Sequence, residues 1–251
     1  MKRAIGIVIL MVAISAPVVA GSHDKASAKA DKQAARHLVD AGTFGIYLNG
    51  RRIGTEKFHV EQGPNTSLAT SEVTIDDGSI RASQSSELEV ASNGALVHYR
   101  WHEDTPEKAQ TSVEPNPNSD FLIQRTTLAS EQKPVEQPYV LPASTLILDD
   151  YFFLHREILA WRYLATICQP TPEGVKCKSG PGQFGVLVPR QHTSMPVQIE
   201  FQGTDKVMIH GAQHDLNRFS LVCEGTEWQL WLDHQNKLVR VVVAGTEVVR
   251  D

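Results

Sequence analysis

Apolar and polar residues alternate along most of the chain from residue 42 onward, which is the pattern of half-buried β-strands. Turn residues such as Asp76-Asp77-Gly78 and Ser92-Asn93-Gly94 separate the alternating segments. The short turns predict an antiparallel meander, wetted on one side. The clearest predicted strands cover residues 44–48, 67–75, 80–90, 95–101, 121–128, 184–188, 197–201, 207–210, 219–223, 228–232 and 238–244.

The segment FGIYLNGRRIGTEKFHV, residues 44–60, predicts a hairpin with an irregularity. Asn49-Gly50 is a strong turn signal, because both residues tolerate a positive φ. The parity of apolar positions then changes between Ile53 and Phe58, which requires an extra residue in one strand. Gly54 is the natural place for this β-bulge, and a bulge bends a sheet. We expect a turn and a curved sheet here, not an active site.

One segment, residues 146–168, breaks the β pattern and predicts a helix near residues 149–167. Asp149 is expected to be its N-cap. The helix is apolar on two faces, so we expect it to be buried on two sides or to lie beside a cavity. We assign Leu154, Ile158 and Trp161 to the core. The side chains expected to line a partly open apolar pocket are Phe152, Leu159 and Tyr163. A helix with no cavity beside it is the alternative.

These patterns predict an α+β, β-predominant fold, in which a curved antiparallel sheet (meander or half-barrel) packs on one main helix. Residues 1–20 have the features of a signal peptide, with Lys2 and Arg3 before an apolar run and small residues up to Ala20. The run is too short to span a membrane. We therefore expect cleavage after Ala20, a flexible linker over residues 21–40, and a single β-rich domain over residues 41–251.

The predicted signal peptide places the protein in the periplasm or outside the cell. The whole chain has a formal net charge of −5, and removal of Lys2 and Arg3 makes it more negative. This charge argues against nucleic acid and anionic membrane surfaces as partners. In an oxidising compartment we expect a disulfide between Cys168 and Cys177, with Cys223 a buried free thiol.

Motifs for catalysis and for cofactors are not found. The chain has no GxSxG elbow, no GxGxxG, no P-loop and no HExxH. His210 and His214 could approach each other across a turn beside Asp215, but we assign no metal there. We predict no cofactor and no catalytic residue, and favour a protein that is not an enzyme.

Four short motifs occur in order: YLNGRRIGTEKF, LDDYFFLHREILA, FGVLVP and LWLDHQNKLVRV. Over residues 42–250 the chain resembles secreted bacterial β-rich families of unknown function. These are distantly similar to periplasmic lipoprotein-carrier-like proteins with a curved sheet. The resemblance implies a curved sheet wrapped on helices, and no catalytic residues. This chain has one obvious helix where the carriers have several, which puts a large carrier-type cavity in doubt.

Three functions are compatible with these patterns. The first is the binding of an apolar or lipid-like ligand between the curved sheet and the helix. A cavity between the two would support this function. The second is an interaction or structural module of the envelope, with an envelope protein as partner. A filled core would support this function. The third, less favoured, is a hydrolase of unrecognised type. A buried cluster of histidine with carboxylates would support this function.

Overall fold

The computed structural model describes residues 36–119, 121–130, 133–171 and 174–251. The predicted signal peptide and most of the predicted linker lie outside these residues. The described chain forms a 15-stranded sheet, a two-stranded sheet and an α-helix, as the predicted α+β, β-predominant class requires.

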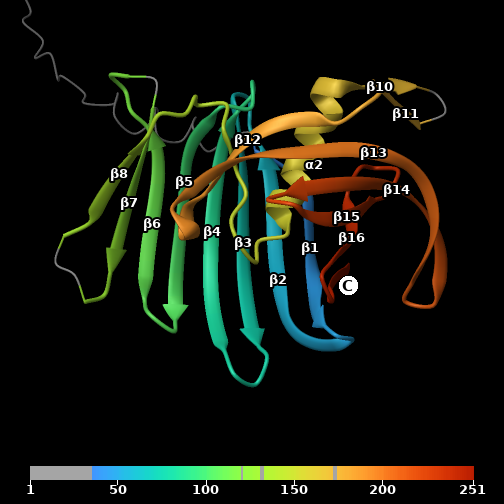
Figure 1. Cartoon of the computed structure of the whole chain (residues 1–251), viewed down its shortest axis with the longest axis horizontal. Helices are drawn as coiled ribbons and strands as arrows, with labels where there is room; N and C mark the ends of the chain where they lie inside the picture. Colours follow the sequence, from blue (N-terminus) through green and yellow to red (C-terminus); the bar gives the residue numbers. More distant parts are fainter. Residues whose placement is uncertain (1–35, 120, 131–132, 172–173) are drawn as a thin grey trace, which may run out of the picture. The chain divides into compact units, whose positions relative to one another are not determined.

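The large sheet has two halves (Figure 1). The strands of the first half are β1 (His37–Leu48), β2 (Arg51–Gln62), β3 (Thr66–Asp76), β4 (Arg81–Ala91), β5 (Leu96–Thr105), β6 (Ala109–Pro115), β7 (Leu122–Leu128) and β8 (Val135–Tyr139). Those of the second half are β9 (Leu146–Ile147), β12 (Gly182–Val188), β13 (Thr193–Ile209), β14 (Ala212–Cys223), β15 (Thr226–Leu232), β16 (Leu238–Val243) and β17 (Thr246–Arg250). A 3-10 turn, η1 (Pro189–Gln191), joins β12 to β13.

Each half is a meander of neighbouring antiparallel strands, and the two halves meet where β1 pairs with β17. The short β9 lies parallel to β12 at one edge of the sheet, and β8 forms the other edge. The small sheet joins β10 (Cys168–Thr171) to β11 (Gly174–Cys177). Strands β12 and β13 cross in front of the helix in Figure 1, at a steep angle to the strands of the first half.

The hairpin at Asn49-Gly50 confirms the prediction from the turn residues. Asn49 and Gly50 have φ values of 51° and 80°. Gly54 pairs with Ile46, whereas Arg52 pairs with Tyr47, so Ile53 is the extra residue of a bulge next to Gly54. A Cβ atom on Gly54 would lie 2.3 Å from the carbonyl oxygen of Thr74 in β3. Glycine is therefore required where the bulged strand meets its neighbour.

The helix, α2 (Leu154–Ile167), is packed between the two halves. At its start, the main-chain N–H of Leu154 donates a hydrogen bond to Glu56 in β2. Further along, the ring of Tyr163 packs edge-on against that of Phe219 in β14. The helix thus contacts both halves of the sheet; it was expected to be buried on two sides or to lie beside a cavity, and one of its faces is only half-buried. Its expected start at Asp149 is wrong, because Tyr151 adopts a left-handed φ of 62°, which a helix cannot continue through.

Three segments extend further as strands than the sequence suggests. β1 begins at His37, so residues 37–40 belong to the sheet and not to the linker. The two strands expected on either side of Gly203 are one continuous β13 with a register shift at that glycine. The expected loop before Tyr139 contains most of β8. Edge and hairpin strands carry many polar residues, so alternation alone does not reveal them.

The predicted disulfide between Cys168 and Cys177 is present and joins β10 to β11 at the end of α2. Cys223 is a free thiol, as predicted. It is only partly buried, whereas we expected it to be buried. The apolar core is one cluster that takes residues from both halves and from α2. A second, smaller cluster under the β13–β14 hairpin contains Val207, Ile209, Leu216 and Trp231.

Candidate functional site

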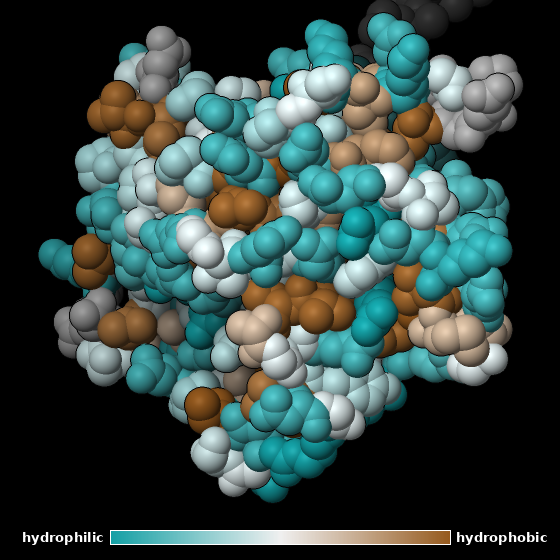
Figure 2. Space-filling model, turned by 45° about the vertical axis from the view of Figure 1, so that its right-hand side comes forward, coloured by the Kyte–Doolittle hydropathy of each residue, from teal (hydrophilic) through white to brown (hydrophobic). Residues whose placement is uncertain are grey.

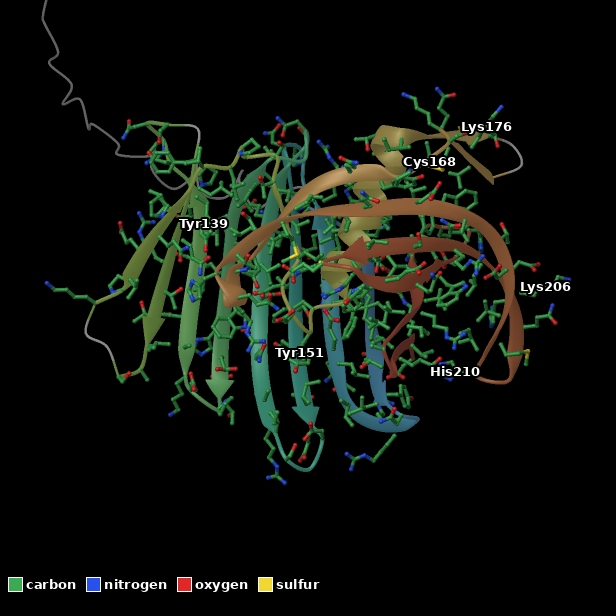
Figure 3. All side chains as sticks on the ribbon, in the orientation of Figure 1. Tyr139, Tyr151, Cys168, Lys176, Lys206 and His210 are labelled. Atoms are coloured by element: carbon green, nitrogen blue, oxygen red, sulfur yellow. A yellow bond between two sulfur atoms is a disulfide. The ribbon has the colours of Figure 1, made fainter. Side chains whose placement is uncertain are left out.

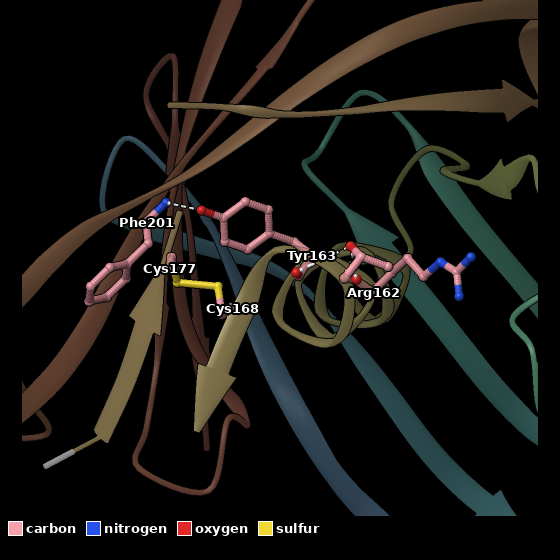
Figure 4. The surroundings of a disulfide bond; sticks show 6 residues. Arg162, Tyr163, Cys168, Cys177 and Phe201 are labelled. Atoms are coloured by element: carbon pink, nitrogen blue, oxygen red, sulfur yellow. Dashed lines mark hydrogen bonds between the residues drawn. A yellow bond between two sulfur atoms is a disulfide. The ribbon is translucent and has the colours of Figure 1, made fainter. Parts of the chain in front are cut away.

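The helix face expected to line a pocket is filled. Phe152, Leu159 and Tyr163 have exposed fractions of 0%, 1% and 0%. None of them lines the three cavities beside α2 that are described below. Figure 4 shows Tyr163 reaching from α2 toward Phe201, whose main-chain N–H donates a hydrogen bond of 3.2 Å to its hydroxyl. The assignment of an open pocket to this face is corrected, because the second half of the sheet covers it.

An apolar groove lies instead along the opposite face of α2. Ile158 and Trp161, expected in the core, are only partly buried and line a cavity of about 290 Å³ between the helix and the first half of the sheet. The apolar residues that complete its lining are Val39, Val60, Ala69, Val90, Ala91 and Leu146. The two helix faces thus have the reverse of their expected roles, whereas Leu154, at 1% exposed, is a core residue as predicted.

A second cavity, of about 370 Å³, shares Val39 and Trp161 with the first. Its other apolar residues are Leu164, Ala165 and Val175. We call the two cavities together the Trp161 groove. The indole N–H of Trp161 donates a hydrogen bond to the carbonyl oxygen of Asn236, in the turn between β15 and β16. The ring is therefore fixed by one polar edge while its apolar body contributes to the groove.

Each of the two cavities has one charged side chain in its lining. Arg162 lines the first cavity together with the polar residues Gln62, Ser67 and Ser92. Lys237 lines the second cavity, and its ammonium lies 3.0 Å from the carboxylate of Asp40. On the face drawn in Figure 2, apolar residues form small patches between polar ones. A concave, mostly apolar site with a few polar groups is the usual form of a small-molecule pocket.

A buried polar cluster lies on the inner side of α2, at its start. The carboxylate of Glu56 accepts hydrogen bonds from the N–H groups of Phe153 and Leu154 and from the hydroxyl of Ser71, at 2.7, 3.2 and 2.6 Å. Burial raises the pKa of Glu56 to about 7, although these hydrogen bonds act to lower it. Glu56 therefore caps the helix from a neighbouring strand, in the role expected of Asp149.

Asp149 and His155 belong to the same cluster. Asp149 accepts a hydrogen bond of 2.7 Å from the hydroxyl of Tyr99, and its own N–H donates to Nδ1 of His155. Burial raises the pKa of Asp149 to about 6 and lowers that of His155 to about 3. The contact between His155 and Asp149 is to the main-chain N–H of Asp149 and not to its carboxylate, so the two do not form the histidine–carboxylate pair of a hydrolase. Tyr99, Asp149 and His155 are at most 1% exposed, so a substrate has no access to them in this conformation.

A third cavity, of about 260 Å³, lies beside Arg156 and contains the free thiol of Cys223. The guanidinium of Arg156 lies over the ring of Trp228, 4.6 Å from its centroid, and donates to the carbonyl oxygens of Asp149 and Phe152. These contacts hold the arginine in the wall of the cavity. They explain its burial without a ligand.

The histidine pair considered for a metal does not form a site. His210 lies in the turn between β13 and β14, at the far end of the hairpin in Figure 3, and its ring is hydrogen-bonded to the carbonyl oxygen of Arg250. His214 is in β14, opposite Val207. Within the described ranges, histidine, cysteine and carboxylate side chains form no group of three that could hold a metal ion.

Comparison of the chain with protein-family models, with curated proteins and with solved structures finds no match. In the part of the chain that the structure describes, no helix has the length and apolar character needed to cross a membrane.

Three notable residues were not predicted from the sequence: Val39, Arg162 and Glu56. The predicted linker includes Val39, although Leu38-Val39 is an apolar pair in a polar stretch and marks the start of a strand. Arg162 interrupts an otherwise apolar helix, which is a weak signal for a charged group beside a groove. Glu56 has the same strand parity as the buried Phe58, which signals an inward carboxylate.

Proposed function

We propose that this protein binds an elongated apolar or lipid-like molecule in the Trp161 groove. The observation that carries the proposal is the pair of cavities along the half-buried face of α2, lined mainly by apolar side chains. Each methylene group of a ligand buried there contributes about 0.8 kcal/mol. An acyl chain that buries about six to eight of them gains about 5–6 kcal/mol before the cost of its ordering.

We propose further that binding takes place outside the cytoplasm, in the periplasm or the medium. The signal-like sequence at residues 1–20 supports this, and the disulfide between Cys168 and Cys177 is compatible with an oxidising compartment. The intact mass of protein recovered from the periplasm or medium of an expressing bacterium tests it. The expected chain begins at Gly21, and a mass that retains residues 1–20 would contradict export with cleavage.

Ligand binding is tested by titration with a fluorescent fatty acid, comparing the wild type with two neighbouring variants. Val39 lines both cavities, whereas Leu38 lines neither of them and is 61% exposed. Val39→Gln places an amide in the apolar groove and should weaken binding about tenfold, which corresponds to about 1.4 kcal/mol. Leu38→Gln makes the same kind of change in the same strand and should leave the Kd within about twofold of the wild type.

A wild-type protein that binds no such probe would refute this function. The filled core around Phe152, Leu159 and Tyr163 then favours the second candidate, an envelope interaction or structural module. Native mass spectrometry of protein purified from the producing cell's envelope separates the two. A bound small molecule supports the first candidate, and a bound protein supports the second.

A further inference from the structure

Arg162 has surroundings unlike those of the other charged side chains near the groove. It follows Trp161 in α2 and lines the first cavity among mainly apolar neighbours. Its guanidinium donates one hydrogen bond, of 2.9 Å, to the carbonyl oxygen of Asn93. In the described part of the chain it forms no ion pair, whereas Lys237, in the lining of the second cavity, is paired with Asp40.

The acidic side chain of β4 that is nearest in sequence to Asn93 makes its contacts elsewhere. Glu89 lies in β4, shortly before the turn that contains Asn93. It forms an ion pair of 2.7 Å with Arg36 and accepts a hydrogen bond of 2.6 Å from Thr66. His98 also lies 3.3 Å from it. Glu89 therefore pairs with other side chains and not with Arg162.

The guanidinium is also held in place. Figure 4 shows that Arg162 and Tyr163 leave α2 in opposite directions, so that Arg162 extends toward the first half of the sheet. The turn residue Gly94 packs against it so closely that a Cβ atom there would lie 2.5 Å from Nη1. Together with the hydrogen bond to Asn93, this contact holds the charge beside the first cavity and leaves most of the guanidinium's N–H donors available.

We infer that the Trp161 groove selects amphiphiles that carry an acidic head group, and that Arg162 binds this head group. The inference rests on the proposed function and adds the class of ligand. A carboxylate or a phosphate monoester can accept two parallel hydrogen bonds from a guanidinium, which a neutral head group cannot match in strength. The acyl chain would then lie against Trp161 and Val39, toward the second cavity.

The test compares three ligands of equal chain length: a fatty acid, the matching alkyl phosphate and the matching primary alcohol. The affinity of each ligand is measured by its displacement of a bound fluorescent fatty acid. The measurement is made on the wild type and on the variants Arg162→Gln, Arg162→Lys and Arg100→Gln. Arg100 is an exposed arginine in β5 that lies outside the groove, and it serves as the control for loss of a positive charge. Circular dichroism establishes that each variant is folded.

We expect the wild type to bind one or both acids at least about tenfold more tightly than the alcohol. Arg162→Gln should abolish most of this preference and leave alcohol binding within about twofold, Arg162→Lys should retain part of it, and Arg100→Gln should retain all of it. Preference for the phosphate over the carboxylate, or the reverse, identifies the head group.

Two results overturn the inference in distinguishable ways. If acids and alcohol bind the wild type equally, or if Arg162→Gln preserves the preference, the head-group role of Arg162 is refuted while the apolar groove stands. If none of the three ligands displaces the fluorescent fatty acid, or the fatty acid itself does not bind, the proposed function and this inference are refuted together.

Discussion

Truncation of two neighbouring helix residues separates the core from the groove. Leu159 is 1% exposed and belongs to the core cluster that takes residues from both halves of the sheet, so Leu159→Ala leaves a cavity in this core. A substitution of this kind costs about 2–5 kcal/mol. Against a total stability of about 5–15 kcal/mol for a typical domain, this is a large loss. Ligand binding should change little, because Leu159 does not line the groove.

We expect Trp161→Ala to weaken ligand binding more than it lowers stability. Trp161 is only partly buried, and part of its ring faces the groove. Its truncation removes some packing and the hydrogen bond to Asn236, which contributes about 0.5–1.5 kcal/mol. We expect a loss of about 1–3 kcal/mol, smaller than the loss for Leu159→Ala. Binding of a fluorescent fatty acid should weaken by about tenfold or more, because the indole supplies the wall shared by both cavities.

The free energies of unfolding are measured by urea denaturation, followed by circular dichroism because one variant lacks a tryptophan. Binding is measured at a temperature at which both variants are folded, with Trp161→Phe as a control that keeps an aromatic ring. If Leu159→Ala weakens binding more than Trp161→Ala does, the pocket is on the face expected from the sequence. If Trp161→Ala is the more destabilising of the two, the burial argument itself fails.

Three further predictions concern the sheet, the helix cap and the thiols. Gly54→Ala should destabilise by about 1–3 kcal/mol in urea denaturation because its Cβ would overlap the carbonyl oxygen of Thr74, whereas Gly185→Ala, which has open space, should be nearly neutral; equal effects would contradict this. The pKa of Glu56 is raised to about 7 in the folded state, so the folded protein keeps a proton that the unfolded chain releases above pH 4.5, and stability rises as the pH falls. Wild type should therefore gain about 2 kcal/mol over Glu56→Gln between about pH 7.5 and 5, and a constant difference would exclude the shift. Alkylation of the unfolded, unreduced protein should add one group, at Cys223, and a second adduct would show that the disulfide is absent.

Local rules were sufficient for the turns and for most strands. Asn49-Gly50 and the bulge beside Gly54 follow from backbone sterics and from the parity of apolar positions, and both are present. The pairing of Cys168 with Cys177 also follows from their short separation. These features depend on residues near one another in the sequence, which is where sequence patterns carry most information.

The roles of the two helix faces could not be obtained in this way. Both faces are apolar, and the sequence does not state which face the second half of the sheet covers. Tyr163 is buried because β13 and β14, far away in the sequence, pack against it. The predicted helix start is wrong for a similar reason, since the cap is Glu56, which lies 97 residues before Phe153 in the chain.

The pairing of β1 with β17 makes the middle of the sheet, rather than an edge, depend on segments from opposite ends of the described chain. Phe44 lies opposite Arg250, whose guanidinium also donates a hydrogen bond of 2.7 Å to the buried Asp40. β1 and β17 cannot pair until β17 has been synthesised. Until then, the edge of β1 that faces β17 stays unpaired. Such long-range pairing slows folding and exposes a strand that invites aggregation. Loss of the last strand would therefore open the sheet at its centre, and would not merely shorten it.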